Sequence, residues 1–430
     1  MLQEIREILI LQKREIEKKL KERYTERNQN LKLDNDLIKV ITGPRRAGKS
    51  FFAIHFLNKG KFGYINFDDE KLTEIKNYDE LITAMNSVYD SPKFVLFDEI
   101  QNLPKWELFV NRLQRQGYNL IITGSNSNLL SKELATHLTG RHLLTNIFPF
   151  SFEEYLRFEN KELTTTEIKE KLFHYLFEGG YPEILVKKLE VKEYLSLLFN
   201  SILYKDIVKR YNIRNPKQLE DLAFYLISNI ANEYSYNSLT KIGKIKNSRT
   251  IEKYLNYLEE SFILFNISRF SYKVKEQLSS NKKIYCIDNS FIQAKAFKSS
   301  PDFGKLYENI AAIELKKKEL NNDIKVYYWK NQQQEEVDFV LKEGLKIKQL
   351  IQVCFNLNNI ETKNREIRSL IKASKELKCN NLLIITEDKE AEENVEWFGT
   401  KANIKFIPLW KWLLELEKTP LQNHQEHERI

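Results

Sequence analysis

The chain has 430 residues, of which 42% are hydrophobic and 30% are charged, and its formal net charge is +8 at pH 7. This length predicts roughly two to four domains, and no segment approaches the ~18 consecutive apolar residues of a membrane span. Three widely spaced cysteines imply no disulfide framework, and an N-terminus that mixes acidic and basic residues is unlike a signal or transit peptide, so we expect a cytoplasmic protein with no membrane partner.

The first predicted elements are an N-terminal helical segment (1–35), a strand, a glycine-containing loop and a helix. Residues 37–43 (LIKVITG) form a β-branched run typical of a buried strand, and the apolar spacing in 50–60 predicts a helix. Between them, GPRRAGKS matches the phosphate-binding pattern G-x-x-x-x-G-K-[ST]. In this arrangement backbone N–H groups and a helix N-terminus can hold phosphates. The residues expected to bind a nucleotide are Gly43, Pro44, Arg45, Arg46, Ala47, Gly48, Lys49, Ser50 and Phe51.

Four side chains carry specific expectations in this site. Lys49 would reach the β- and γ-phosphates of a nucleoside triphosphate, and Ser50 would ligate Mg²⁺. A carboxylate is also needed on a neighbouring strand, and residues 94–99 (FVLFDE) end in Asp98 and Glu99. We expect Asp98 to hold Mg²⁺ through water or through Ser50, and Glu99 to orient and deprotonate the attacking water. The simpler alternative for an Asp-Glu pair after a strand is a helix N-cap.

Further β-rich runs complete a sheet. They lie at 64–70 (YINFDDE), 119–125 (NLIITGS) and 142–150 (HLLTNIFPF). With the two strands above and the intervening helices, they predict an α/β fold with a doubly wound parallel sheet. Ser125 or Asn126 would lie beside the γ-phosphate as a polar sensor, or would simply end a strand before a capped helix.

Seven segments together resemble a known family. They are GPRRAGKS, VLFDEIQNLPKWE, ITGSNSNLL, TGR (139–141), EGGYPE (178–183), YKDIVKRYNIR (204–214) and EEVDFVL (335–341). On these motifs the chain resembles prokaryotic, largely archaeal AAA-type ATPases that carry a nuclease-like C-terminal domain. The resemblance implies an AAA-type P-loop ATPase core (36–150), a helical lid (151–217), a winged helix (218–295) and a restriction-endonuclease-like domain (296–430).

The resemblance also implies roles for residues outside the loop. Arg141 resembles an arginine finger, which stabilises charge on the transferring phosphoryl group, often from a neighbouring subunit. A salt bridge to the lid is the simpler alternative. Gly179 and Gly180 would form either a hinge or a helix C-cap.

The segment 219–283 predicts three helices (219–235, 236–246 and 247–261) followed by two β-rich runs around a polar tip, which is the order of a winged helix. Residues 241–283 contain ten Lys or Arg and four Glu, so a nucleic-acid partner is expected. The residues that would face a major groove, because they lie off the apolar stripe of the third helix, are Arg249, Thr250, Lys253 and Asn256. Those expected at DNA phosphates are Lys273, Lys275, Lys282 and Lys283. Winged helices also serve as protein-contact modules, so this alternative stays open.

The C-terminal part predicts a helix (306–320), a hairpin (324–344) and a buried strand (350–355), an order that resembles the restriction-endonuclease fold. The resemblance implies that active members hold a metal ion with acidic residues and orient the attacking water with a lysine. Glu308 and Asp338 match two acidic positions, with Glu336 alongside, but the expected E-x-K reads Gln352-Val353-Cys354. We therefore expect no cleavage of DNA with Mg²⁺ or Mn²⁺.

The complete prediction is an ATP-hydrolysing, Mg²⁺-dependent AAA-type molecular switch that acts on duplex DNA. No Asn-Lys-x-Asp motif for guanine occurs. The alternative is a nucleotide-gated signalling or assembly protein of a defence or toxin-control system, acting through protein contacts. Both of these functions are compatible with a homo-oligomer or with a protein partner.

Overall fold

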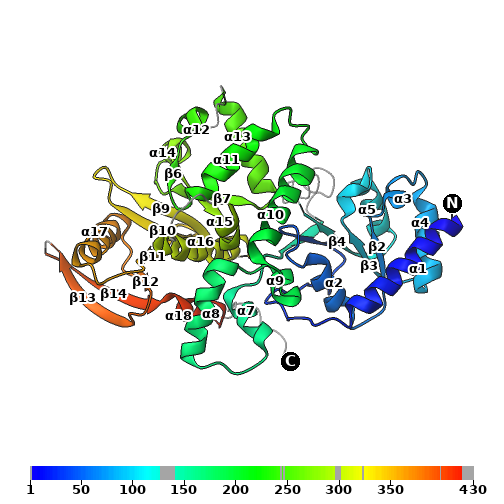
Figure 1. Ribbon diagram of the computed structural model, residues 1–430, viewed down its shortest axis with the longest axis horizontal. Coiled ribbons are helices and arrows are strands. Elements are labelled where there is room, and N and C mark those ends of the chain that lie inside the picture. The colour runs from blue at the N-terminus through cyan, green and yellow to red at the C-terminus, as the bar shows by residue number, and fades with distance from the viewer. Residues whose placement is uncertain are drawn as a thin grey trace. The chain divides into compact units, whose positions relative to one another are not determined.

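The computed structural model describes residues 2–125, 141–242, 245, 247–295, 302–321, 324–397 and 399–418. The chain divides into two compact units. Unit 1 comprises Met1–Phe150, Tyr181–Leu189 and Glu260–Phe262, and unit 2 comprises Ser151–Gly180, Glu190–Glu259 and Ile263–Ile430. The elements of both are labelled in Figure 1.

Unit 1 contains a five-stranded sheet in which every neighbouring pair of strands is parallel. The strands are β1 (Ile38–Thr42), β2 (Phe62–Asn66), β3 (Phe94–Asp98), β4 (Asn119–Gly124) and β5 (His142–Asn146). Their order across the sheet is β2–β3–β4–β1–β5. The apolar residues of the central strands are buried in the core, as is usual for a parallel sheet with helices on both faces. This confirms the predicted α/β class with a doubly wound parallel sheet.

The helices of unit 1 come before, between and after its strands in the chain. They are α1 (Leu2–Lys19), α2 (Lys49–Leu57), α3 (Glu70–Thr73), α4 (Tyr78–Tyr89), the 3₁₀ helix η1 (Ile100–Asn102), α5 (Trp106–Arg115) and α9 (Pro182–Lys187). The N-terminal helix α1 packs against α4 and β2. There the Gln12 side chain donates to the Asn66 carbonyl at 3.1 Å and accepts from the Asn66 N–H at 2.9 Å. The N-terminal helix is therefore tied to the end of β2.

Unit 2 begins with helices. They are α7 (Phe152–Glu159), α8 (Thr165–Glu178), α10 (Val191–Ser201), the π-helix η2 (Ile202–Val208), α11 (Pro216–Ser228), α12 (Tyr236–Ile242) and α13 (Ser248–Glu260). Later helices are α14 (Val274–Ser279), α15 (Asn289–Lys295), α16 (Phe303–Asn321), α17 (Ile360–Leu377) and α18 (Leu409–Lys418).

Gly179 ends α8 as its C-cap, with φ of 71°. A Cβ at this position would lie 1.8 Å from Oδ1 of Asp288, and the Gly180 N–H donates to the other oxygen of that carboxylate at 2.9 Å. The buried Asp288 thus fixes the glycine pair, and the geometry favours the C-cap alternative over the hinge.

A mixed nine-stranded sheet forms the rest of unit 2. Its strands are β6 (Glu233–Tyr234), β7 (Leu264–Arg269), β8 (Lys282–Cys286), β9 (Ile324–Lys330), β10 (Glu336–Glu343), β11 (Lys346–Val353), β12 (Leu382–Thr386), β13 (Ala391–Trp397) and β14 (Thr400–Pro408). Their order is β13–β14–β12–β11–β10–β9–β7–β8–β6. One continuous sheet therefore spans the segments predicted as a winged helix and as a restriction-endonuclease-like domain.

The predicted winged-helix segment differs from expectation in three places. The helix predicted over 219–235 ends at Ser228, and Glu233–Tyr234 form the short strand β6 instead. The polar tip contains α14. The hairpin of β7 and β8 is antiparallel as predicted, but β7 also pairs in parallel with β9, so the two strands belong to the large sheet and not to a separate wing.

Candidate nucleotide site

The loop between β1 and α2 requires glycine at its first position. Gly43 has φ of 148°, and a Cβ there would lie 1.9 Å from the carbonyl oxygen of Ile147. The same two segments are joined by a hydrogen bond from the Ile147 N–H to the Thr42 carbonyl, at 2.8 Å. Positive φ angles also occur at Arg46 (65°) and Gly48 (92°). Such a tight loop before a helix N-terminus turns successive N–H groups toward an anion.

Lys49 is the first residue of α2 and is almost fully buried. Its ammonium donates to the carbonyl oxygens of Gly43, at 3.1 Å, and of Pro44, at 2.9 Å. The charge is therefore held across the loop by two neutral acceptors. Phosphate oxygens, being charged, are stronger partners for an ammonium than these carbonyls.

The side chain of Ser50, on α2, contacts the side chain of Asp98, the last residue of β3. The Ser50 hydroxyl donates to Asp98 Oδ1 at 2.7 Å, and the Tyr64 hydroxyl donates to Asp98 Oδ2 at 2.8 Å. The Thr123 hydroxyl also donates to Oδ1. A hydroxyl and one carboxylate fit Mg²⁺, which is typically held by one or two carboxylates together with substrate phosphates and water.

Glu99 follows Asp98 in a left-handed backbone conformation, with φ of 51°. Its N–H donates to the Thr123 hydroxyl at 3.0 Å, and its carboxylate accepts a hydrogen bond from Gln101. Glu99 occupies the N-cap position of η1, yet its side chain makes no capping hydrogen bond, so the N-cap alternative does not account for this side chain. Burial raises the pKa of the Glu99 carboxyl, the Lys49 charge lowers it, and the Asp98 charge raises it, with a net increase. A raised pKa makes the carboxylate a better proton acceptor.

Three further residues were predicted to act at the ATP site, namely Ser125, Asn126 and Arg141. Ser125 is buried directly after β4, and Asn126 lies outside the described residues. Arg141 is exposed at the start of β5, where its carbonyl accepts from the Ile38 N–H. Because β1 and β5 are parallel, with Ile38 opposite His142, Arg141 is level with the residue before β1 and lies near the opposite end of the sheet from the P-loop, roughly 20 Å away along the strand at ~3.3 Å per residue.

Sequence reasoning missed two contacts to the loop. The Arg27 guanidinium donates to the carbonyl of Phe148 and, at 3.4 Å, to that of Ala47. Arg46 pairs with Glu183 of α9, with 3.2 Å between their charged atoms. The segment that contains Glu183 was singled out through the motif EGGYPE. No neighbouring residue in the sequence, however, indicated that Glu183 would pair with Arg46.

The predicted nucleic-acid residues divide into two groups. Arg249, Lys253 and Asn256 are exposed on α13, and Thr250 is half-buried, while Ile251, Tyr254, Leu255 and Leu258 are buried. Lys273 and Lys275 are exposed around α14, and Lys273 pairs with Glu276 at 2.9 Å. The expectation that Lys283 contacts DNA phosphate is wrong, because its side chain is 2% exposed and forms ion pairs within unit 2.

Comparison with known proteins identifies the family. A model described as an AAA domain matches residues 35–156, and models of two domains of unknown function match 169–302 and 303–412. The chain is 38% identical over 432 residues to the uncharacterized protein MJ1544 of Methanocaldococcus jannaschii, and the match covers 95% of both chains. The chain belongs to the MJ1544 family. Its AAA domain contains all of the P-loop, Asp98 and Glu99.

The MJ1544 family extends to bacteria. An uncharacterized protein of Haemophilus influenzae is 30% identical over 351 residues, which are 77% of this chain and 86% of that protein. Among solved structures, the Walker-type ATPase PABY2304 of Pyrococcus abyssi is similar with a TM-score of 0.42 and 17% identity, over 61% of this chain and 91% of that chain. Among the described helices, none has the length and apolar character needed to cross a membrane.

Proposed function

We propose that this MJ1544-family protein binds ATP with Mg²⁺ and hydrolyses it as an AAA-type molecular switch. The observation that carries the proposal is the 2.7 Å contact between Ser50 and Asp98, with Lys49 across the loop and Glu99 next in the chain. Mg²⁺ held by Ser50 and Asp98 would neutralise charge on the β- and γ-phosphates. Lys49 would position those phosphates, and Glu99 would accept a proton from the attacking water.

The test is release of phosphate from ATP by the purified full chain, with Mg²⁺ and with EDTA. Mg²⁺-dependent release supports the proposal. If ATP binds but no phosphate is released under either condition, hydrolysis is excluded and only nucleotide-gated binding remains.

Arg141 is proposed to act on the ATP site of a second copy of the chain, because it lies at the far end of its own sheet from the P-loop. We expect Arg141→Ala and Glu99→Gln each to lower ATPase activity, and a mixture of the two variants to recover part of it. In the mixture, a P-loop with an intact Glu99 can meet an intact Arg141 from the other variant. Absence of recovery in an assembly shown to exchange subunits would remove this role.

We further propose that the exposed face of α13 binds duplex DNA, which is supported by the outward Arg249, Lys253 and Asn256. Arg249→Ala/Lys253→Ala is expected to weaken DNA binding and to reduce the slope of log K against log salt by about 0.9 for each phosphate that the variant no longer neutralises. Fluorescence anisotropy with a labelled duplex at several salt concentrations measures both the affinity for DNA and this slope. Lys192→Ala/Lys375→Ala, which removes two charges from exposed positions elsewhere in unit 2, is the matched control.

The protein-contact alternative makes a different prediction in the same samples. If duplex DNA neither binds in a salt-dependent way nor raises the ATPase rate, the DNA proposal fails. Nucleotide-dependent recovery of a partner in a pull-down then favours a signalling or assembly role.

A further inference from the structure

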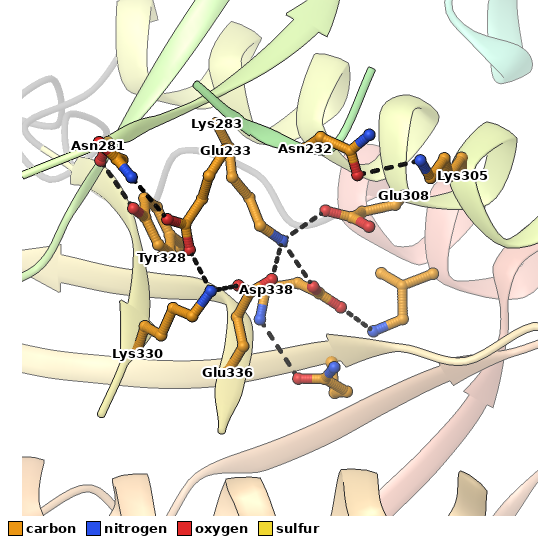
Figure 2. A network of polar contacts seen from close by, with 12 residues as sticks. Asn232, Glu233, Asn281, Lys283, Lys305, Glu308, Tyr328, Lys330, Glu336 and Asp338 are labelled. Atoms are coloured by element: carbon orange, nitrogen blue, oxygen red, sulfur yellow. Dashed lines mark hydrogen bonds and ion pairs between the residues drawn. The ribbon is translucent and has the colours of Figure 1, made fainter. Parts of the chain in front are cut away.

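A buried lysine, Lys283 of β8, lies in unit 2 between three carboxylates that we call the carboxylate cluster: Glu308 of α16, and Glu336 and Asp338 of β10. The Lys283 ammonium is 2.9 Å from Glu308, 3.0 Å from Asp338 and 2.5 Å from Glu336. Figure 2 shows Lys283 reaching from β8 to all three side chains. The lysine side chain is 2% exposed, so water does not share in its solvation.

The surrounding groups complete the hydrogen bonding of the cluster. The Tyr285 hydroxyl donates to Glu308 at 2.7 Å, and the Val353 N–H donates to Asp338 at 3.0 Å. Lys330 lies 3.5 Å from Glu336. These contacts hold the carboxylates in place around the ammonium.

The electrostatics require a cation at this point. Burial alone lowers the pKa of Lys283, but the neighbouring carboxylates, Glu308 foremost, raise it well above its ordinary value, so the side chain stays charged. Burial and the Asp338 charge raise the pKa of Glu308 to about 7, although Lys283 and Tyr285 oppose the shift. An unpaired carboxylate in such a place would be costly.

Carboxylates that converge from a helix and a strand are the usual ligands of a divalent cation in proteins. In this cluster, however, the oxygens contact an ammonium directly. Within the described part of the chain, no group of three or more His, Cys, Asp or Glu residues is arranged to hold a metal ion. Gln352 and Cys354 do not add charge, because Gln352 is neutral and burial raises the pKa of the Cys354 thiol to about 12.

We propose that the Lys283 ammonium is the built-in cation of the carboxylate cluster, taking the place that a divalent ion would occupy. Lys283 comes from the region matched by one domain model, and the carboxylates come from the region matched by the next. The ammonium therefore joins two segments of the chain into one folded unit.

The first test uses the full chain without nucleotide. Lys283→Ala is expected to lower the unfolding temperature in EDTA, and millimolar Mn²⁺ is expected to restore part of the loss, because the shortened side chain leaves the carboxylates free to bind the ion. Mn²⁺ should not raise the unfolding temperature of the wild-type protein. Because the wild-type protein has the same P-loop, it also controls for Mn²⁺ bound at that loop. Lys283→Ala/Asp338→Asn should bind Mn²⁺ more weakly than Lys283→Ala by at least about tenfold. Manganese electron paramagnetic resonance measures the free ion in each sample.

Two results would overturn the proposal: a wild-type Mn²⁺ site that Asp338→Asn removes, or a folded Lys283→Ala that gains nothing from Mn²⁺. If Lys283→Ala does not fold, a second set of variants tests the proposal. Lys283→Met keeps the side-chain length without the charge, and adding Glu308→Gln and Asp338→Asn removes two of the opposing charges. The triple variant should unfold at a higher temperature than Lys283→Met, and a triple variant no more stable than Lys283→Met contradicts the role of Lys283 as the neutralising cation.

Discussion

Lys49→Ala is expected to abolish tight ATP binding. The Lys49 ammonium is nearly buried and lies across the loop from Gly43 and Pro44, where it can exchange two carbonyl partners for phosphate oxygens. A hydrogen bond to a charged group contributes about 1.5–3 kcal/mol, so removing each hydrogen bond to a phosphate oxygen should raise the Kd by roughly tenfold to a hundredfold. Isothermal titration with ATP and Mg²⁺ measures this change.

The control for that experiment is Lys59→Ala, which removes the same charge from an exposed position just after α2. Its ATP affinity should equal that of wild type. Circular dichroism and thermal unfolding establish whether Lys49→Ala is folded, since the substitution also removes two hydrogen bonds to the loop. A folded Lys49→Ala protein with wild-type affinity would show that residues 43–50 do not bind the phosphates.

The sequence predicted the parallel sheet and the P-loop region because their signals are local. A β-branched run, a glycine loop and a helix with apolar spacing follow one another within 37–60, and each depends on neighbours a few residues away. The Asp98 position also follows from a simple rule, since the carboxyl ends of parallel strands meet at one edge of the sheet. The contact with Ser50 is the consequence.

Partners from distant segments could not be predicted in this way. Arg27 reaches the loop from an irregular segment, and Tyr64 reaches Asp98 from a neighbouring strand. Local periodicity shows which face of an element is buried, but it does not show which side chain lies across from that face. Thr123 was within reach of prediction, because its position in β4 is next to Asp98 once the register of β3 and β4 is known.

Lys283 shows why the positive charge of a segment does not by itself identify the residues that contact DNA. A lysine in a basic segment is usually solvated, and its carboxylate partners lie 25 to 55 residues further along the chain. The run KKIYC contained a signal, however. Successive side chains of any strand point to opposite faces of its sheet, so where one face packs against the core, one of two adjacent lysines must point inward.

Glu99→Gln is expected to leave ATP bound while slowing hydrolysis by ~10²–10⁴-fold, the usual contribution of a general base. The amide keeps the shape of the side chain beside Asp98 but cannot take a proton from water. The Glu99 carboxylate has a raised pKa, which suits it to that transfer, and its left-handed backbone fixes its direction next to β3. Phosphate release under saturating ATP and Mg²⁺, together with a separate titration of ATP binding, distinguishes slow chemistry from lost affinity.

Two nearby acids, Asp68 and Asp69, are the alternatives to Glu99. Asp69 caps α3 by accepting from the Lys71 N–H at 3.0 Å, and Asp68 accepts from Asn102 at 2.8 Å. Both are thus engaged in local structure, so Asp68→Asn serves as the matched control and should keep the wild-type rate within a few-fold. If Glu99→Gln turns over at nearly the wild-type rate while Asp68→Asn does not, Asp68 is the base. The role assigned to Glu99 would then be wrong, although its place beside Asp98 would be unchanged.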